Sequence, residues 1–206
     1  MKIIITSVVV GAGFGATTSL VNALSSPYTA LGAPMVGTVW AGAAKVLSLL
    51  MDAGWSWAAL AVAMGWLART WARGALLGAL ALIAATAAYY VTDAFALQET
   101  LAGFESDLVV WWTASVLFGT VLGVVGASIR RPGPVGLLAA LTVPVGAALQ
   151  MILMPPRPHM TMTPAIILAE VTVWTAAAVG AGWAVHRFRT ARHVVGAGAE
   201  RPGQGV

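Results

Sequence analysis

The sequence predicts an all-α protein, a polytopic bundle of transmembrane helices, on three observations. Of the 206 residues, 59% are hydrophobic and only 9% are charged, whereas a soluble domain has roughly 25% charged residues. The apolar residues form long, nearly uncharged stretches separated by short gaps. Positive charges flank alternate gaps, as they do in multi-pass proteins. We therefore expect one compact helical bundle whose main partner is the lipid bilayer.

Five stretches approach the length of about 20 residues that a helix needs to cross a hydrocarbon core of about 30 Å. They are residues 3–24, 74–95, 108–128, 135–154 and 165–186. The first stretch follows Lys2 and ends in small residues, so it loosely resembles a signal peptide. Its apolar run is longer than is usual for a signal peptide, and we expect a retained helix.

The region between residues 33 and 68 is ambiguous. It divides around Asp52 into residues 35–50 and 55–68, and each piece is short for a full span. Two interpretations fit: two tilted spanning helices, or one re-entrant or interfacial helix followed by one span. The bundle then has six spans plus a re-entrant or short helix, or it has seven spans.

Charge sets the expected orientation, because positively charged loops stay in the cytoplasm. Gaps that carry two or more arginines alternate with gaps that carry acidic residues or only Arg157 and His159. With Lys2 also inside, six crossings are favoured, and the C-terminus is cytoplasmic. Residues 1–188 would form the bundle in the cell's cytoplasmic membrane. Residues 189–206, which end in Gly, Pro and Arg, would be a disordered cytoplasmic tail.

Composition argues against several kinds of chemistry. The chain has no cysteine, which excludes disulfides and thiolate sites. His159, His186 and His193 are scattered, and no two share one helical face at a spacing of four, so we expect no bound metal. We also expect no cofactor. The net charge of +4 comes from small clusters beside apolar stretches, so nucleic acid is not an expected partner.

Glycine spacing allows two interpretations. Residues 3–15 resemble a strand that enters the phosphate-binding turn of a dinucleotide fold, but the third glycine is wrongly spaced and no acidic residue lies near twenty positions on. The favoured interpretation is close helix packing in lipid, which small residues four apart permit. Such pairs are Gly11 and Gly15, Gly74 and Gly78, and Gly119 and Gly123.

Three ionisable residues fall at membrane depth: Lys45, Asp93 and Glu170. A charge near the bilayer centre costs about 2.5 to 3.5 kcal/mol, so such residues normally face the bundle interior. In the expected orientation these three residues would meet in one outward-facing polar pocket. The rim of that pocket would carry Asp52, Asp107, Gln150, Arg157 and His159.

Aromatic residues accompany these charges. Glu170 and Trp174 are four apart and share a helical face, and Tyr90 precedes Asp93 by three positions. The predicted ligand-binding residues are Lys45, Asp93, Glu170, Trp174 and Tyr90, and the candidate catalytic acids are Glu170 and Asp93. The alternative is a structural ion pair of Lys45 with one of the two acids. Most of the nine tryptophans lie near span ends, where indoles anchor at the headgroup level.

The chain also contains several loose local patterns. They are the polar turn at residues 22–34, Val39-Trp40, Tyr89-Tyr90, and Trp111-Trp112 leading to Gly119, Gly123, Gly126 and Arg130-Arg131. In these features, and over most of residues 11–187, the chain resembles a family of small multi-pass actinobacterial membrane proteins of unassigned function. The resemblance implies a helical bundle in a Gram-positive cytoplasmic membrane. It transfers no activity to any residue.

Three function classes remain open. The leading hypothesis is capture or translocation of a small amphiphilic molecule through the outward-facing pocket, by a homo-oligomer or within a larger membrane complex. No internal repeat of the kind common in secondary transporters is visible. The second hypothesis is an intramembrane enzyme of the isoprenoid-cyclase type, in which Glu170 or Asp93 protonates a lipophilic substrate and aromatic rings stabilise the cation. The third hypothesis is a non-enzymatic membrane scaffold.

Overall fold

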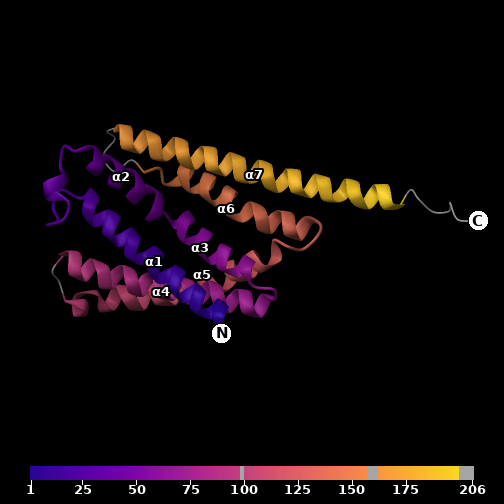
Figure 1. The fold of residues 1–206 in the computed structure, drawn as a ribbon, viewed down its shortest axis with the longest axis horizontal. Helices are drawn as coiled ribbons and strands as arrows, with labels where there is room; N and C mark the ends of the chain where they lie inside the picture. Colours follow the sequence, from indigo (N-terminus) through magenta and orange to yellow (C-terminus); the bar gives the residue numbers. More distant parts are fainter. Residues whose placement is uncertain (98–99, 157–161, 200–206) are drawn as a thin grey trace, which may run out of the picture.

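Every regular element in the described part of the chain is helical (Figure 1). The structure is a computed structural model that describes residues 1–97, 100–156 and 162–199. The helices are α1 Lys2–Ser25, α2 Val39–Met51, α3 Gly54–Leu67, α4 Trp71–Leu97, α5 Glu105–Ser128, α6 Pro134–Leu153 and α7 Pro164–Ala199, with short 3-10 helices η1 Ala33–Met35 and η2 Leu101–Phe104. The prediction of an all-α helical bundle is confirmed.

Five helices, α1, α4, α5, α6 and α7, are long and apolar enough to cross a membrane. Each coincides with one of the five predicted stretches, and most of the predicted ends are right within three residues. The exception is α7, which continues through Ala199, past the boundary predicted at residue 188. Its last turns are rich in Ala and Arg, which support a helix. Residues 200–206 lie outside the described residues, and disorder of the tail stays a prediction.

The ambiguous region forms a bent pair of helices. α2 and α3 have 13 and 14 residues and meet at an angle of 62°. Each is only about 20 Å long, too short to cross alone. Figure 1 shows α2 starting beside the end of α1 and α3 continuing to the opposite end of the bundle, where α4 begins. The pair therefore follows the path of one broken span, which with the other five helices gives up to six crossings and places both termini towards the same end (Figure 1).

Side-chain size is distributed as expected for a protein in lipid. The small residues Ser7, Thr18 and Ala85 are fully buried, whereas the large residues Phe118 and Leu138 are 63% and 68% exposed. In lipid the apolar surface of a large side chain needs no burial, and helices associate through small residues that let their backbones approach. The bundle interior is therefore rich in small and hydroxyl-bearing side chains, alongside a few large ones such as Leu77.

α1 and α4 are in direct backbone contact. Gly11 lies against the main chain of Ala81, and Gly15 lies one turn further on, against that of Ala85. A Cβ atom at either glycine would overlap the facing carbonyl oxygen. The first helix is thus an integral packing element, and the helical conformation of its glycine region rules out the dinucleotide turn.

α4 and α5 form a second glycine contact. Gly74 and Gly78 on α4 face Gly123 and Gly119 on α5, and a Cβ atom at any of them would meet the backbone of the other helix. α3 joins the same contact because Gly65 packs on the main chain of Gly123. The predicted role of small residues four apart is confirmed at all three pairs.

α6 and α7 form an outer layer. They pack against each other and cover α2 and α3 (Figure 1). Ala147 of α6 and Val173 of α7 form the centre of a small apolar cluster that includes Trp55 of α3. This layer therefore supports the broken crossing from the side opposite α4 and α5.

Candidate functional site

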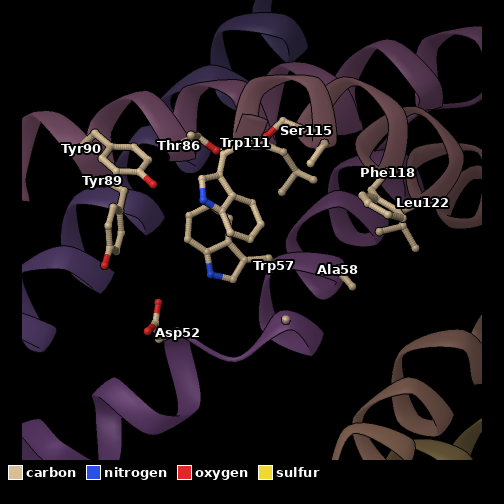
Figure 2. Close-up of a pocket in the computed structure, with 13 residues that line it drawn as sticks. Asp52, Trp57, Ala58, Thr86, Tyr89, Tyr90, Trp111, Ser115, Phe118 and Leu122 are labelled. Atoms are coloured by element: carbon tan, nitrogen blue, oxygen red, sulfur yellow. Dashed lines mark hydrogen bonds between the residues drawn. The ribbon is translucent and has the colours of Figure 1, made fainter. Parts of the chain in front are cut away.

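A cavity of about 530 Å³ lies between α3, α4 and α5 (Figure 2). Its described lining residues are Asp52, Gly54, Trp57, Ala58, Leu82, Thr86, Tyr89, Tyr90, Trp111, Ala114, Ser115, Phe118 and Leu122. From Tyr90 to Leu82 the α4 wall extends about 12 Å along the helix axis. The cavity therefore starts near the α4–α5 connection and reaches well into the bundle.

The lining is polar at one end and apolar at the other. Figure 2 places Asp52, Tyr89 and Tyr90 at one end and Phe118 and Leu122 at the other. The rings of Trp57 and Trp111 lie between these ends (Figure 2). A molecule that filled this space would meet oxygen atoms at its head and carbon along its body.

Asn22 of α1 organises the polar end. The Ser48 hydroxyl donates a hydrogen bond to Asn22 Oδ1 over 2.6 Å, and Asn22 Nδ2 donates to the Tyr89 hydroxyl over 3.2 Å. The Asp52 carboxylate lies close enough to the Asn22 side chain and to the Lys45 ammonium for both to act on it. One amide thus connects α1, α2 and α4 by hydrogen bonds and lies beside the helix break.

Asp52 lies at the break between α2 and α3 and lines the cavity. A broken helix at membrane depth is tolerated where other groups satisfy the freed backbone atoms. Here Gln150 Oε1 of α6 accepts a hydrogen bond from the Trp55 amide over 2.9 Å. The Ser56 hydroxyl donates to the carbonyl oxygens of Met51 and Ala53, both over 2.6 Å. With the backbone satisfied in this way, the Asp52 side chain remains exposed at the cavity mouth.

A chain of aromatic contacts stiffens the cavity wall. Phe14 and Trp57 pack edge to face with centroids 5.3 Å apart, and Trp57 contacts Tyr89 at 6.2 Å. The chain continues from Tyr89 to Tyr90 at 5.4 Å and from Tyr90 to Phe104 at 5.4 Å. Edge-to-face pairs each add about 0.5 to 1.5 kcal/mol beyond burial. The rings are therefore held in place before any ligand arrives.

The two hydroxyl groups of the inner wall are paired with each other. The hydroxyls of Thr86 on α4 and Ser115 on α5 lie 3.1 Å apart in a buried hydrogen bond. Two buried hydroxyls that hydrogen-bond to each other do not need a hydrogen bond from a ligand. The inner part of the cavity is thus apolar in effect.

The structure brings together part of the predicted site. Tyr90 lines the cavity, and Lys45 lies half-buried on α2 close enough to act on Asp52. Asp52, predicted only at the rim, belongs to the lining itself. Asp93 is directed towards α1, where its Oδ1 accepts a hydrogen bond from the Ser19 hydroxyl over 3.3 Å. Asp93 is therefore a neighbour of the cavity and not one of its described lining residues.

The two predicted residues on α7 lie elsewhere. Glu170 is half-buried and Trp174 is 44% exposed, and none of the described lining residues comes from α7. The cavity therefore does not unite Lys45, Asp93 and Glu170, and ligand binding by Glu170 and Trp174 stays a prediction. Of the predicted rim, Gln150 caps α3 and Asp107 lies in the first turn of α5. Arg157 and His159 lie outside the described residues.

Sequence reasoning missed Asn22, Trp57 and Trp111 as site residues. Asn22 was assigned to a polar turn, although an amide before the end of an apolar helix is itself a signal of interior hydrogen bonding. Trp57 and Trp111 were assigned to the interfacial belt because both are near span ends. Only the pairing of α3 with α4 and α5 shows that they line a cavity.

Among the described residues, no three His, Asp or Glu side chains are grouped so that they could hold a metal ion. The all-helical fold, with five long apolar helices and a bent pair that can make a sixth crossing, is that of a multi-pass helical membrane protein. Comparison of the chain with protein-family models, curated proteins and solved structures finds no match.

Proposed function

We propose that the protein captures a small amphiphilic molecule in the cavity between α3, α4 and α5, for binding or translocation in the cytoplasmic membrane. The two-ended lining supports this function most directly, because the oxygen atoms at one end and the rings at the other match a polar head and an apolar body. The volume of about 530 Å³ falls within the range of about 300 to 1,000 Å³ typical of ligand pockets.

The charge distribution supports an outward-facing polar end. The inner ends of the spans carry Arg69, Arg73, Arg130, Arg131 and Arg187, whereas Asp52, Asp93, Glu105, Asp107 and Glu170 lie towards the other end. Positive loops stay in the cytoplasm. In this orientation the C-terminus is cytoplasmic, and the cavity's polar end faces the outer leaflet.

The side-chain groups at the cavity mouth indicate which class of ligand fits the site. The exposed Asp52 carboxylate accepts hydrogen bonds and attracts a cation, and the phenols of Tyr89 and Tyr90 can donate or accept. Trp57 and Trp111 present ring faces that bind cationic or apolar groups. A lipophilic amine, or a lipophile whose head donates hydrogen bonds, fits these groups better than an anion does.

Entry from the bilayer is supported by the exposure of the lining. Trp111 and Phe118 both line the cavity, and they are 55% and 63% exposed. Both residues belong to α5, whose lipid-facing surface therefore continues into the cavity. An amphiphile in the outer leaflet could enter sideways with its head kept at the membrane surface.

Dodecylamine is a suitable probe for this site, with dodecanol and dodecanoate as matched ligands of other head chemistry. We expect saturable binding of radiolabelled dodecylamine to the protein in nanodiscs, above the partition into empty nanodiscs. Asp52→Asn should weaken it by about tenfold or more, because a charge-assisted hydrogen bond contributes about 1.5 to 3 kcal/mol. Dodecanoate should compete worst.

A matched pair of substitutions on α5 tests the location. Ala114 lines the cavity, so Ala114→Phe places a ring inside it and should abolish saturable binding. Leu117→Phe adds bulk to an exposed position, 61% accessible, that is not among the lining residues, and it should leave binding unchanged. No saturable component in the wild type, or equal loss in both variants, would contradict the proposal.

A protonation-initiated enzyme remains the second candidate, because the cavity combines one carboxyl group with several aromatic ring faces. In this candidate the Asp52 carboxyl donates its proton to a substrate alkene, ring closure moves the cation, and the carboxylate recovers a proton as a new alkene forms. The product is an isomer of the substrate and no co-reactant is needed. Turnover of a polyprenyl substrate that is lost in Asp52→Asn and retained in Glu170→Gln would favour this candidate over capture.

A further inference from the structure

A second cavity, of about 450 Å³, lies at the opposite end of the bundle from the amphiphile site. It forms where the α3–α4 turn meets the α5–α6 turn. Its described lining includes Arg69, Trp71, Arg130, Arg131 and Pro132. We call it the arginine cleft. The proposed capture function makes no use of it.

Two of the cleft's guanidinium groups are held by tryptophan rings. The Arg131 guanidinium carbon lies 3.7 Å from the centroid of Trp71, and that of Arg130 lies 4.6 Å from the centroid of Trp66. Stacking uses the face of a guanidinium and leaves the N–H groups at its edge available to an acceptor in its plane. The two arginines are thus positioned before a ligand binds.

The cleft carries positive charge that no acidic residue in its described lining offsets. The acidic residues Asp52, Asp93, Glu105, Asp107 and Glu170 lie towards the opposite ends of the spans. Glu99 and Glu200 lie outside the described residues. Three arginines in one concave site, with no carboxylate among its described lining residues, produce a strong local attraction for anions.

The place of the cleft along the spans indicates which anion it meets. Trp66 and Trp71 are partly exposed at the ends of apolar helices, where indoles mark the headgroup level. Exposed apolar side chains of α6, Val135 and Leu138, begin just beyond Pro132 and offer a surface to acyl chains. Arginine forks match the geometry of phosphate oxygens.

We propose that the arginine cleft binds a phosphate group, either that of an anionic phospholipid headgroup or that of a free phosphate ion. Arg130 and Arg131 supply edge N–H donors from their stacked positions, and Arg69 supplies a third charge from the α3–α4 turn. Basic pockets between transmembrane helices bind anionic headgroups in this way. Binding here would stabilise the inner end of the bundle and is independent of the amphiphile site.

Native mass spectrometry of the full-length protein tests the lipid source. Delipidated protein in detergent is mixed with phosphatidylglycerol or with phosphatidylcholine of the same acyl chains. We expect one retained phosphatidylglycerol, with phosphatidylcholine retained about tenfold less well. Each Arg near an anionic surface contributes a factor of about five, so Arg130→Gln/Arg131→Gln should weaken retention by about 30-fold.

A matched double variant controls for charge alone. Arg187→Gln/Arg189→Gln removes the same charge at the same end of the bundle but outside the cleft, and should change retention less than about threefold. If Arg130→Gln/Arg131→Gln does not fold, Arg69→Gln provides the test, with an expected loss of about fivefold.

A thermal-unfolding series in inorganic phosphate, against chloride at equal ionic strength, tests the free-ion source. A phosphate-specific rise in Tm that depends on Arg130 and Arg131, without lipid retention, would support a phosphate site filled from solution. Retention of phosphatidylglycerol that phosphate does not displace would support the lipid. Neither effect, or equal losses in the two double variants, would overturn the proposal.

Discussion

The two halves of α4 and α5 are built differently. In the halves next to the α3–α4 and α5–α6 turns, glycines bring the two backbones into contact at Gly74 and Gly123 and at Gly78 and Gly119. In the halves next to the α4–α5 connection, the same helices carry Tyr89, Tyr90 and Trp111, and a cavity lies beside these rings. Residue size along one helix pair thus distinguishes a close backbone contact from an end that carries the aromatic rings of a cavity.

The two halves also use hydrogen bonds differently. The glycine contact needs few of them, because close backbones gain dispersion energy directly. The cavity end relies on Asn22, whose side chain is hydrogen-bonded to Ser48 and Tyr89 and lies beside Asp52. Stability should therefore depend on glycine at one end and on a polar network at the other.

Gly123→Leu should have the largest effect, because its side chain would overlap the main chain of Gly74. We expect a loss of about 3 kcal/mol, at the upper end of the cost of overpacking. Thermal unfolding in detergent measures it. Gly146→Leu is the control, because no atom lies within 4 Å of a Cβ at that position. Equal stability of the two variants would contradict the glycine contact.

Asn22→Ala should cost about 2 kcal/mol, because it leaves several polar partners without their hydrogen bond. The comparison is Ser7→Ala, which removes a single hydrogen bond to the Leu77 carbonyl oxygen and should cost about 0.6 kcal/mol. The unfolding midpoints of the two variants, measured under the same conditions, show which variant loses more stability. A larger loss in Ser7→Ala would show that the network around Asn22 is unimportant.

Gln150→Leu should cost about 1 kcal/mol, the typical value for loss of a helix cap. The change removes the acceptor for the Trp55 amide, so hydrogen exchange should accelerate at the start of α3. Gln150→Glu keeps an acceptor and should retain slow exchange there. Unchanged exchange in Gln150→Leu would mean that another group, or water, satisfies the break.

Thr86→Val should have the smallest effect, about 0.6 kcal/mol, which is an average value for a hydrogen bond between transmembrane helices. Thr86 bonds Ser115 at the boundary between the glycine contact and the cavity. Unfolding in detergent measures the loss, and binding of dodecylamine should be almost unchanged. A strong effect on binding alone would indicate that this hydroxyl pair contacts the ligand.

The helices were predictable because each is a long apolar run bounded by charge or a turn. The ends of α1 and α6 fall within one residue of the prediction. The small-residue contacts were predictable for a similar reason, since a spacing of four places two glycines on one face. Local signals of this kind need no knowledge of which helices become neighbours.

The cavity was not predictable in the same way. Trp57 and Trp111 lie near span ends, and a sequence does not distinguish an anchor at the headgroup level from a residue that faces a neighbouring helix. Asp52 and Tyr90 were found because a carboxylate or phenol in apolar sequence is conspicuous. Glu170 is equally conspicuous, yet α7 lies in the outer layer and supplies none of the described lining residues.

Native mass spectrometry of the protein extracted gently from its own host tests the capture of an amphiphile most directly. We expect one co-purified lipophile with an amine or hydrogen-bond-donating head on the wild type and on Leu117→Phe. The same species should be absent from Ala114→Phe, in which a ring obstructs the cavity. A wild-type protein that carries no such molecule, or an Ala114→Phe protein that retains it, would contradict the account.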